Sequence, residues 1–199
     1  MSSEDWPTER SIGGILSADP EENPYFSDAN HVFVPYCTSD SWSGTASHRN
    51  EDGFTFMGRH IIREVIRQLS DYQQLQFGTE LFLAGSSAGA TGVLVNVDYV
   101  ANLMSPHGVR VRGIVDSGWF LDNTAHGGNI NSQIRNLQFG IKMWQANVND
   151  ECAREYSEDL WKCYIGYRAQ PHIKSKFAPL YVHLHRYVLY NNIQPLVHA

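Results

Sequence analysis

The pattern of hydrophobic and polar positions predicts four helices. Apolar residues recur every three to four positions over residues 54–69 and again over residues 93–104, which is the spacing of helices with one buried face. A short helix is expected over residues 151–156. The same spacing marks a further helix through Ile134, Leu137, Ile141 and Trp144.

Short apolar runs rich in β-branched and aromatic residues predict the strands. They occupy residues 31–37, 80–84 and 109–115, and a run over residues 180–190 predicts a further strand at its start. Strands that alternate with helices form parallel sheets joined by right-handed crossovers. The fold class is therefore expected to be α/β, with a mostly parallel sheet and helices on both faces.

The composition is that of a packed globular domain. With 199 residues, 42% of them hydrophobic and 18% charged, the chain suits one domain, expected over residues 1–199 with an extended lead-in at residues 1–30. The formal charge of −6 argues against a nucleic-acid-binding surface. No apolar run approaches the roughly 20 residues needed to cross a bilayer, so no membrane span is expected.

The amino-terminal residues and the cysteines bear on the compartment. The opening Met-Ser-Ser-Glu-Asp is polar and acidic, so it carries no secretory signal and, taken literally, favours the cytosol. Cys37, Cys152 and Cys163 form no C-x-x-C pair, so no zinc or redox motif is expected. Cys152 and Cys163 either close a short disulfide loop in an oxidising compartment or remain two buried thiols.

The small-residue stretch LFLAGSSAGATG, residues 81–92, holds the main candidate for chemistry. A G-x-S-x-G pattern centred on Ser87 lies between a predicted strand and a predicted helix, which is the context of a nucleophile elbow. There the backbone N–H of Ala88 would stabilise a developing oxyanion. The alternative is a tight strand-to-helix turn whose small residues serve packing. Ser86 fits the G-x-S-x-G pattern less well than Ser87, because alanines rather than glycines stand two positions on either side of it.

Two phosphate-binding interpretations of the same stretch fail on spacing. A Walker loop needs a lysine directly after its last glycine, and no lysine follows Gly89 or Gly92. The glycines also lack the G-x-G-x-x-G spacing of a dinucleotide fingerprint. Acyl transfer through a serine is the chemistry that remains.

Three motifs carry a family resemblance that covers roughly residues 1–180. GSSAGATGVLVNVD (residues 85–98), VPYCTSDSWSG (residues 34–44) and DSGWFLDN (residues 116–123) resemble the pectinacetylesterase/Notum family. The stretch PEENPYFSDANHVFVPYC, together with Phe56-Met57-Gly58, is more similar to the Notum branch than to the plant pectin branch.

The resemblance implies a partial α/β-hydrolase fold and a secreted serine carboxylesterase that needs no cofactor or metal. Its implied substrate is the palmitoleate ester on Wnt proteins, whose removal inhibits Wnt signalling, and cell-surface glycans are a further implied partner. Ser87 matches the family nucleophile, Ala88 an oxyanion-hole amide and Phe120 a wall of the acyl pocket. Further apolar pocket positions, for which ordinary core packing is an equally open alternative, fall on Leu137, Tyr164 and Ile165.

Two members of the catalytic triad have no match at the expected positions. The family acid follows the strand expected near Leu180, but Val188 falls near its place, and no Asp or Glu follows Asp159. Asp116, at the end of another strand, is a rescue candidate, although a structural role in its loop is the simpler interpretation. The family histidine lies beyond the last residue, and the histidines available instead are His107, His126, His183, His185 and His198.

We therefore expect a partial chain with a divergent tail over residues 180–199 and little esterase activity of its own, because Ser87 lacks its general base. Two alternatives remain open. One is a non-catalytic remnant of the hydrolase fold that binds a lipid or a glycan. The other is a pectin-type O-acetylesterase.

Overall fold

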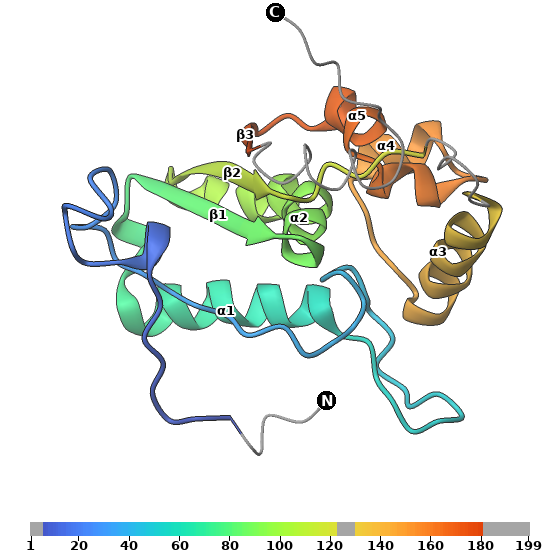
Figure 1. Ribbon diagram of the computed structural model, residues 1–199, viewed down its shortest axis with the longest axis horizontal. Helices are drawn as coiled ribbons and strands as arrows, with labels where there is room; N and C mark the ends of the chain where they lie inside the picture. The colour runs from blue at the N-terminus through green and yellow to red at the C-terminus, as the bar shows by residue number, and fades with distance from the viewer. Residues whose placement is uncertain (1–5, 123–129, 181–199) are drawn as a thin grey trace, which may run out of the picture. The chain divides into compact units, whose positions relative to one another are not determined.

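The computed structural model describes residues 6–122 and 130–180, with side chains for residues 6–122 and 134–178 (Figure 1). The chain divides into two compact units, Met1–Cys37 and Thr38–Ala199. The single domain expected over the whole chain stays a prediction.

The first unit contains one short 3-10 helix among its described residues, η1 (Gly14–Leu16). Asn23 is buried and holds this turn in place. Its side-chain amide donates to the carbonyl oxygens of Ile15 and Ser17 at 3.1 and 2.9 Å.

The second unit alternates helices and strands as the sequence predicts. Its elements are α1 (Gly58–Gln73), η2 (Leu75–Phe77), β1 (Glu80–Ser86), α2 (Ala88–Met104), η3 (Ser105–His107), β2 (Arg110–Asp116), α3 (Ile130–Trp144), α4 (Asp150–Glu155), η4 (Leu160–Tyr164), α5 (Gly166–Ala169), η5 (Gln170–His172) and β3 (Lys176–Leu180). None of the described helices combines the length and the apolar character that crossing a membrane requires.

The strands form a parallel sheet, which confirms the α/β prediction. Within the described residues its order is β1-β2-β3. Ser86 pairs with Asp116, and Asp116 pairs with Leu180, so the carboxyl ends of all three strands lie at one edge of the sheet. Loops at this edge of an open parallel sheet are where α/β proteins place their ligands.

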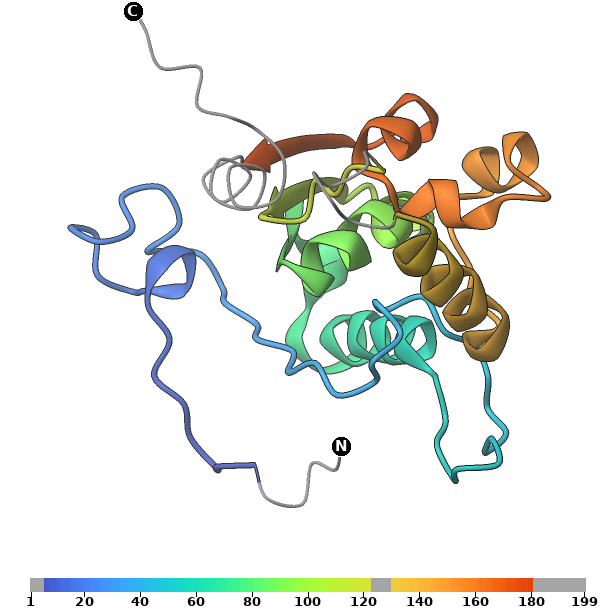
Figure 2. The ribbon, with the colours of Figure 1, turned by 45° about the vertical axis from the view of Figure 1, so that its right-hand side comes forward.

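Helix α2 is the central element of the second unit. Its residues Val93, Val97 and Val100 are at most 2% exposed and pack with Val111 and Val115 of β2. Figure 2 shows α2 beside the strands, with α3, α4 and α5 grouped together. A helix that is apolar around most of its circumference is buried on several sides. On the other face of the sheet Phe82 is 40% exposed. The expectation that helices cover this second face as well therefore stays a prediction.

A second core joins α3, α4 and η4, and a disulfide crosses it. Cys152 and Cys163 are bonded, and both side chains are at most 1% exposed. This confirms the disulfide and excludes the two buried thiols that the sequence left open. Cys37 has no disulfide partner.

Loss of this disulfide is expected to destabilise the chain. The bridge closes a loop with a sequence separation of 11. A loop of this size is expected to contribute about 2–3 kcal/mol, because it restricts the unfolded chain. The double variant Cys152→Ala/Cys163→Ala should therefore lower the free energy of urea unfolding by that amount. Cys37→Ser is the matched control and should leave it unchanged, and equal effects of the two would refute a stabilising bridge.

Two predicted strands differ from the structure. Residues 31–37 form no strand, and Val32 and Phe33 are 48% and 46% exposed, so the strand prediction there was wrong. Pro35 interrupts this run and cannot donate a ladder hydrogen bond. The strand expected to begin near residue 180 instead ends there as β3, and residues 181–190 lie outside the described part of the chain.

The helix boundaries also shift. α1 begins at Gly58 rather than at residue 54, because the chain before it forms a loop around a buried carboxylate. α2 begins at Ala88, five residues before the predicted start, because the small residues after the serine are already helical. α5 has four residues and is too short to leave a periodic pattern.

Candidate active site

Ser87 occupies a sharp turn between β1 and α2. Its φ and ψ are 55° and −116°, a region that side chains other than glycine rarely adopt. Its N–H donates to the carbonyl oxygen of Asp116 at 3.0 Å, and its own carbonyl accepts from the N–H of Thr91 at 3.2 Å. These two bonds hold the strained residue between the sheet and the helix, with its side chain exposed.

Only the first glycine of the G-x-S-x-G pattern is required by close packing. A Cβ at Gly85 would lie less than 3.0 Å from the carbonyl oxygen of Gly89, which is backbone and cannot move aside cheaply. A Cβ at Gly89 would meet no atom within 4 Å. The turn therefore depends on Gly85, while position 89 tolerates a side chain.

This difference gives a paired prediction. Gly85→Ala is expected to lower the free energy of unfolding by about 2–3 kcal/mol, since the added methyl overpacks the turn. Gly89→Ala is expected to change it little or to raise it by up to about 1 kcal/mol, because alanine is the better helix former. Urea unfolding of both variants tests the geometry, and equal destabilisation would contradict it.

The amino end of α2 creates a positive electrostatic potential beside the serine. The N–H groups of the first helical turn, that of Ala88 among them, have no acceptor within the helix. They carry the positive end of the helix dipole. Negative charge that develops on a substrate oxygen near Ser87 would be stabilised there.

The loop after β2 lies against the start of α2. A Cβ at Gly118 would lie less than 3.0 Å from the side chain of Ala90, so glycine allows this close approach. The loop carries Phe120, which is half-buried. The carboxylate of Asp116 accepts a hydrogen bond from the Ser117 hydroxyl at 3.0 Å, as a structural residue of the loop would.

The other predicted pocket residues lie in the second core. Tyr164 and Ile165 are 3% and 7% exposed, and partly buried Leu137 of α3 packs against the same cluster. The hydroxyl of Tyr164 donates to the Ser43 hydroxyl at 2.7 Å. Phe120 is linked to this region because its carbonyl accepts the N–H of Gly166 at 3.4 Å. The four residues are thus linked by packing in one core and by this backbone hydrogen bond, and their role as an acyl pocket stays a prediction.

The histidines that could act as a base are not brought to the serine within the described residues. His107 ends η3, just before the amino end of β2, whereas Ser87 follows the carboxyl end of β1. His126, His183, His185 and His198, and the acid position near Val188, lie outside the described residues. No group of three or more His, Cys, Asp or Glu residues in the described part of the chain could hold a metal ion.

Asp40 is a structural residue that the sequence analysis missed. Its side chain is 0% exposed. One carboxylate oxygen accepts from the Thr38 hydroxyl and from the N–H of Trp42, and the other accepts from the N–H groups of Gly44 and Gly58. The backbone around it is strained, since Ser39, Ser41 and Trp42 all have positive φ. The carboxylate thus organises the loop that leads into α1.

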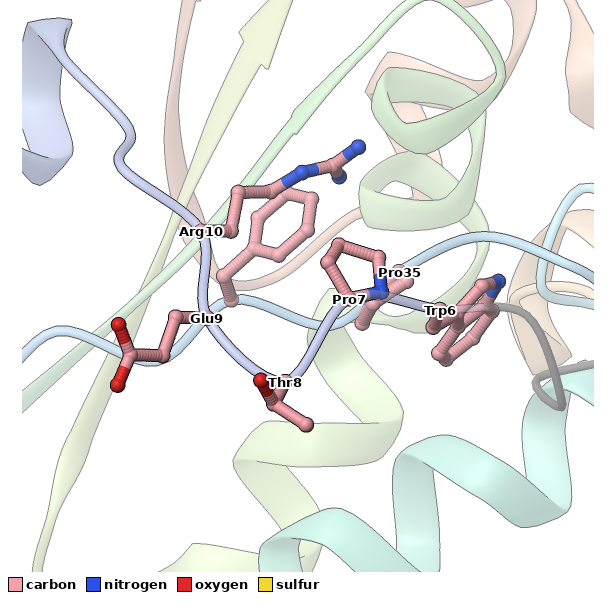
Figure 3. A pocket seen from close by; sticks show the side chains of 7 residues that line it. Trp6, Pro7, Thr8, Glu9, Arg10 and Pro35 are labelled. Carbon is pink, nitrogen blue, oxygen red and sulfur yellow. The ribbon is translucent and has the colours of Figure 1, made fainter.

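A shallow pocket of about 280 Å³ lies in the first unit, away from these residues in sequence. It is lined by residues 6–10 together with Phe33 and Pro35. Figure 3 shows the labelled side chains of Trp6, Arg10 and Pro35 at this pocket. The guanidinium carbon of Arg10 lies 5.4 Å from the centre of the Phe33 ring. None of the residues assigned to the serine site lines this pocket.

A serine held in a strained turn between a parallel strand and a helix is the arrangement found in the nucleophile elbow of the α/β-hydrolase class. Ser87 has this geometry, and its role as a nucleophile stays a prediction. The family model described as Pectinacetylesterase matches residues 1–193 of this chain. The chain belongs to the pectinacetylesterase family. The resemblance drawn from its motifs is confirmed.

Relatives within the family are named for ester hydrolysis. The chain is 44% identical over 192 residues to the human palmitoleoyl-protein carboxylesterase NOTUM, covering 92% of this chain and 38% of the human protein. Identity to the Drosophila melanogaster protein of the same name is 42% over 190 residues, covering 92% of this chain and 28% of that protein. The chain therefore spans about two fifths or less of these relatives.

A solved structure confirms the fold. The crystal structure of the Wnt deacylase Notum from Drosophila matches with a TM-score of 0.85 at 40% identity. The match covers 90% of this chain and 54% of the Notum chain. The partial α/β-hydrolase fold is therefore established for this chain.

Proposed function

We propose that this chain supplies the nucleophile of a carboxylic ester hydrolase, and that the nucleophile is Ser87. The observation that carries the proposal is the strained turn that presents an exposed Ser87 at the amino end of α2. In the reaction the Ser87 hydroxyl oxygen attacks the ester carbonyl, and a general base takes its proton. The alcohol leaves, and water then releases the acid from the acyl-enzyme.

Two features support a long acyl chain as the part of the substrate that is removed. The loop beside Ser87 carries Trp119 and Phe120, both half-buried, so it offers an apolar wall. The relatives described above are named as palmitoleoyl-protein carboxylesterases. We infer that the substrate is a lipidated protein, with palmitoleoylated Wnt as the partner, and that its hydrolysis inhibits Wnt signalling.

The disulfide supports a place outside the cytosol. Cys152–Cys163 is buried in the second core, and such bonds persist in oxidising compartments. This agrees with a secreted enzyme. Cell-surface glycans as a further partner remain part of the proposal.

The preference for long or short acyl chains is tested in a grafted enzyme, in which a relative supplies the part of the fold that this chain does not cover. In this grafted enzyme, residues 6–180 of the chain replace the aligned region of the Drosophila relative. We expect kcat/KM for a fluorogenic octanoate ester to exceed that for the acetate ester by about tenfold or more, as a few buried methylenes provide. A preference for acetate would contradict the lipid substrate and support the second candidate, the O-acetylesterase activity that the family name describes.

The chain by itself is expected to show little turnover. Residues 160–199 contain no Asp or Glu, so they supply no carboxylate side chain to orient a base. Loss of triad members typically costs several orders of magnitude in rate. The octanoate assay on the purified chain tests this, and turnover that disappears in the Ser87→Ala variant would contradict it.

A further inference from the structure

The loop over residues 117–122 is attached at its carboxyl end to the start of α5. The ring of Trp119 packs on Gly166, where a Cβ would lie 2.5 Å from a ring atom. The same ring lies 6.4 Å from the ring of Phe177 in β3. With the hydrogen bond from Gly166 to the Phe120 carbonyl, the loop is packed and bonded to the start of α5 and also packs beside β3.

Asp122 completes this attachment with an ion pair. One of its carboxylate oxygens accepts from the Tyr167 hydroxyl. The other accepts from the Arg168 guanidinium, with Nε at 2.9 Å and Nη2 at 2.7 Å. The side chains of Asp122 and Arg168 are 9% and 30% exposed, so the pair is partly shielded from water and salt.

Asp122 remains ionised in this environment. Burial raises the pKa of its carboxyl, but the hydrogen bonds from Tyr167 and Arg168 outweigh that effect and hold the pKa below its usual range. Hydrogen bonds to ionised groups are about twice as strong as neutral ones. The attachment is therefore complete at neutral pH.

Phe120 lies between the two attached ends of this loop. On its amino side Gly118 packs on Ala90, and the Asp116 carbonyl accepts the N–H of Ser87. On its carboxyl side Asp122 is bound to α5. The chain at Phe120 is therefore held between α2 and α5, and the Asp122 ion pair is one of the contacts that hold it.

We propose that Asp122 is a positioning residue, which holds Phe120 as a wall of the acyl site through its bonds to Tyr167 and Arg168. The proposal rests on the proposed function, since it is the lipid substrate that gives Phe120 a ligand. Asp122 touches no reacting atom and acts through the loop that it fixes. Its loss would weaken the binding of long acyl chains more than that of short ones.

The chain offers a matched control in Glu80. This carboxylate also accepts from guanidinium groups, those of Arg110 and Arg112, at 3.0 to 3.1 Å. It lies at the amino end of β1, at the opposite edge of the sheet from Ser87. Glu80→Gln therefore removes a similar ion pair without touching the loop.

The experiment compares Asp122→Asn with Glu80→Gln in the chain itself. Hydrogen exchange at residues 117–122 should speed up by about tenfold in Asp122→Asn and stay unchanged in Glu80→Gln, as loss of a charged hydrogen bond to this loop implies. In the same samples, palmitoleate and octanoate displace a fluorescent sixteen-carbon fatty acid. The Kd of palmitoleate should rise by about tenfold, and that of octanoate by a smaller factor. Tyr167→Phe, which keeps the ion pair, should give a smaller effect in the same direction and guards against misfolding of Asp122→Asn.

The outcomes separate the proposal from the function on which it rests. Unchanged exchange in both variants of the attachment would overturn it. Faster exchange with wild-type affinities for both fatty acids would show a structural role only, and would overturn it as well. A wild-type chain that folds but binds no fatty acid would instead contradict the lipid function, and the positioning role with it.

Discussion

Replacement of Ser87 by alanine is expected to lower kcat/KM of the grafted enzyme for the octanoate ester by roughly 10⁴-fold or more. The serine oxygen forms the acyl-enzyme, and no other group in the turn occupies its strained position with φ of 55°. The residual rate would come from binding and from the Ala88 amide alone. The assay is initial-rate hydrolysis measured over a range of substrate concentrations.

Ser86 provides the control for this variant. It is the neighbouring serine, it is also exposed, and it belongs to β1 rather than to the turn. Ser86→Ala should retain activity within a small factor of the wild-type grafted enzyme. A larger loss of activity in Ser86→Ala than in Ser87→Ala would contradict the proposal and assign the nucleophile to Ser86.

The largest expected effect on stability is that of Asp40→Ala. The substitution removes the acceptor for the N–H groups of Trp42, Gly44 and Gly58, inside a loop where Asp40 is 0% exposed. Buried donors left without a partner cost about 1–3 kcal/mol each, so a total of about 3–5 kcal/mol is expected. The free energy of urea unfolding measures this loss.

Asn50→Ala is the control for this stability effect. The side chain of Asn50 also accepts two backbone N–H groups, those of Asp52 and Phe54, but these bonds are exposed. Water can replace an exposed acceptor, so a loss of about 0.5–1 kcal/mol is expected. Equal losses in the two variants would show that burial of Asp40 has no particular importance.

The elements that the sequence predicted well are those with two clearly different faces. β2 alternates buried positions with less buried ones, and α3 repeats its apolar residues at helical spacing, so periodicity alone identifies both. Residues 31–37 have the composition of a strand, yet a strand also needs a partner. No pattern within seven residues contains that information. β3 and α5 were misplaced or missed because five and four residues carry too little periodic signal.

The candidate site divides in the same way. The strand-turn-helix geometry at Ser87 could be predicted because it is local, with all of its requirements inside one short stretch. Asp40 and Asp122 could not, because their roles depend on donors that are 18 and 46 residues away in the chain. A buried carboxylate looks like any other Asp in a polar loop until the fold brings its donors to it.

Covalent labelling of the serine tests the central claim most directly. The grafted enzyme is inactivated with a fluorophosphonate, which phosphonylates an activated serine, and the modified peptide is identified by mass spectrometry. We predict that the modification falls on Ser87 in proportion to the activity lost. Inactivation with the label on Ser86, Ser117 or another residue, and with Ser87 unmodified, would contradict the assignment.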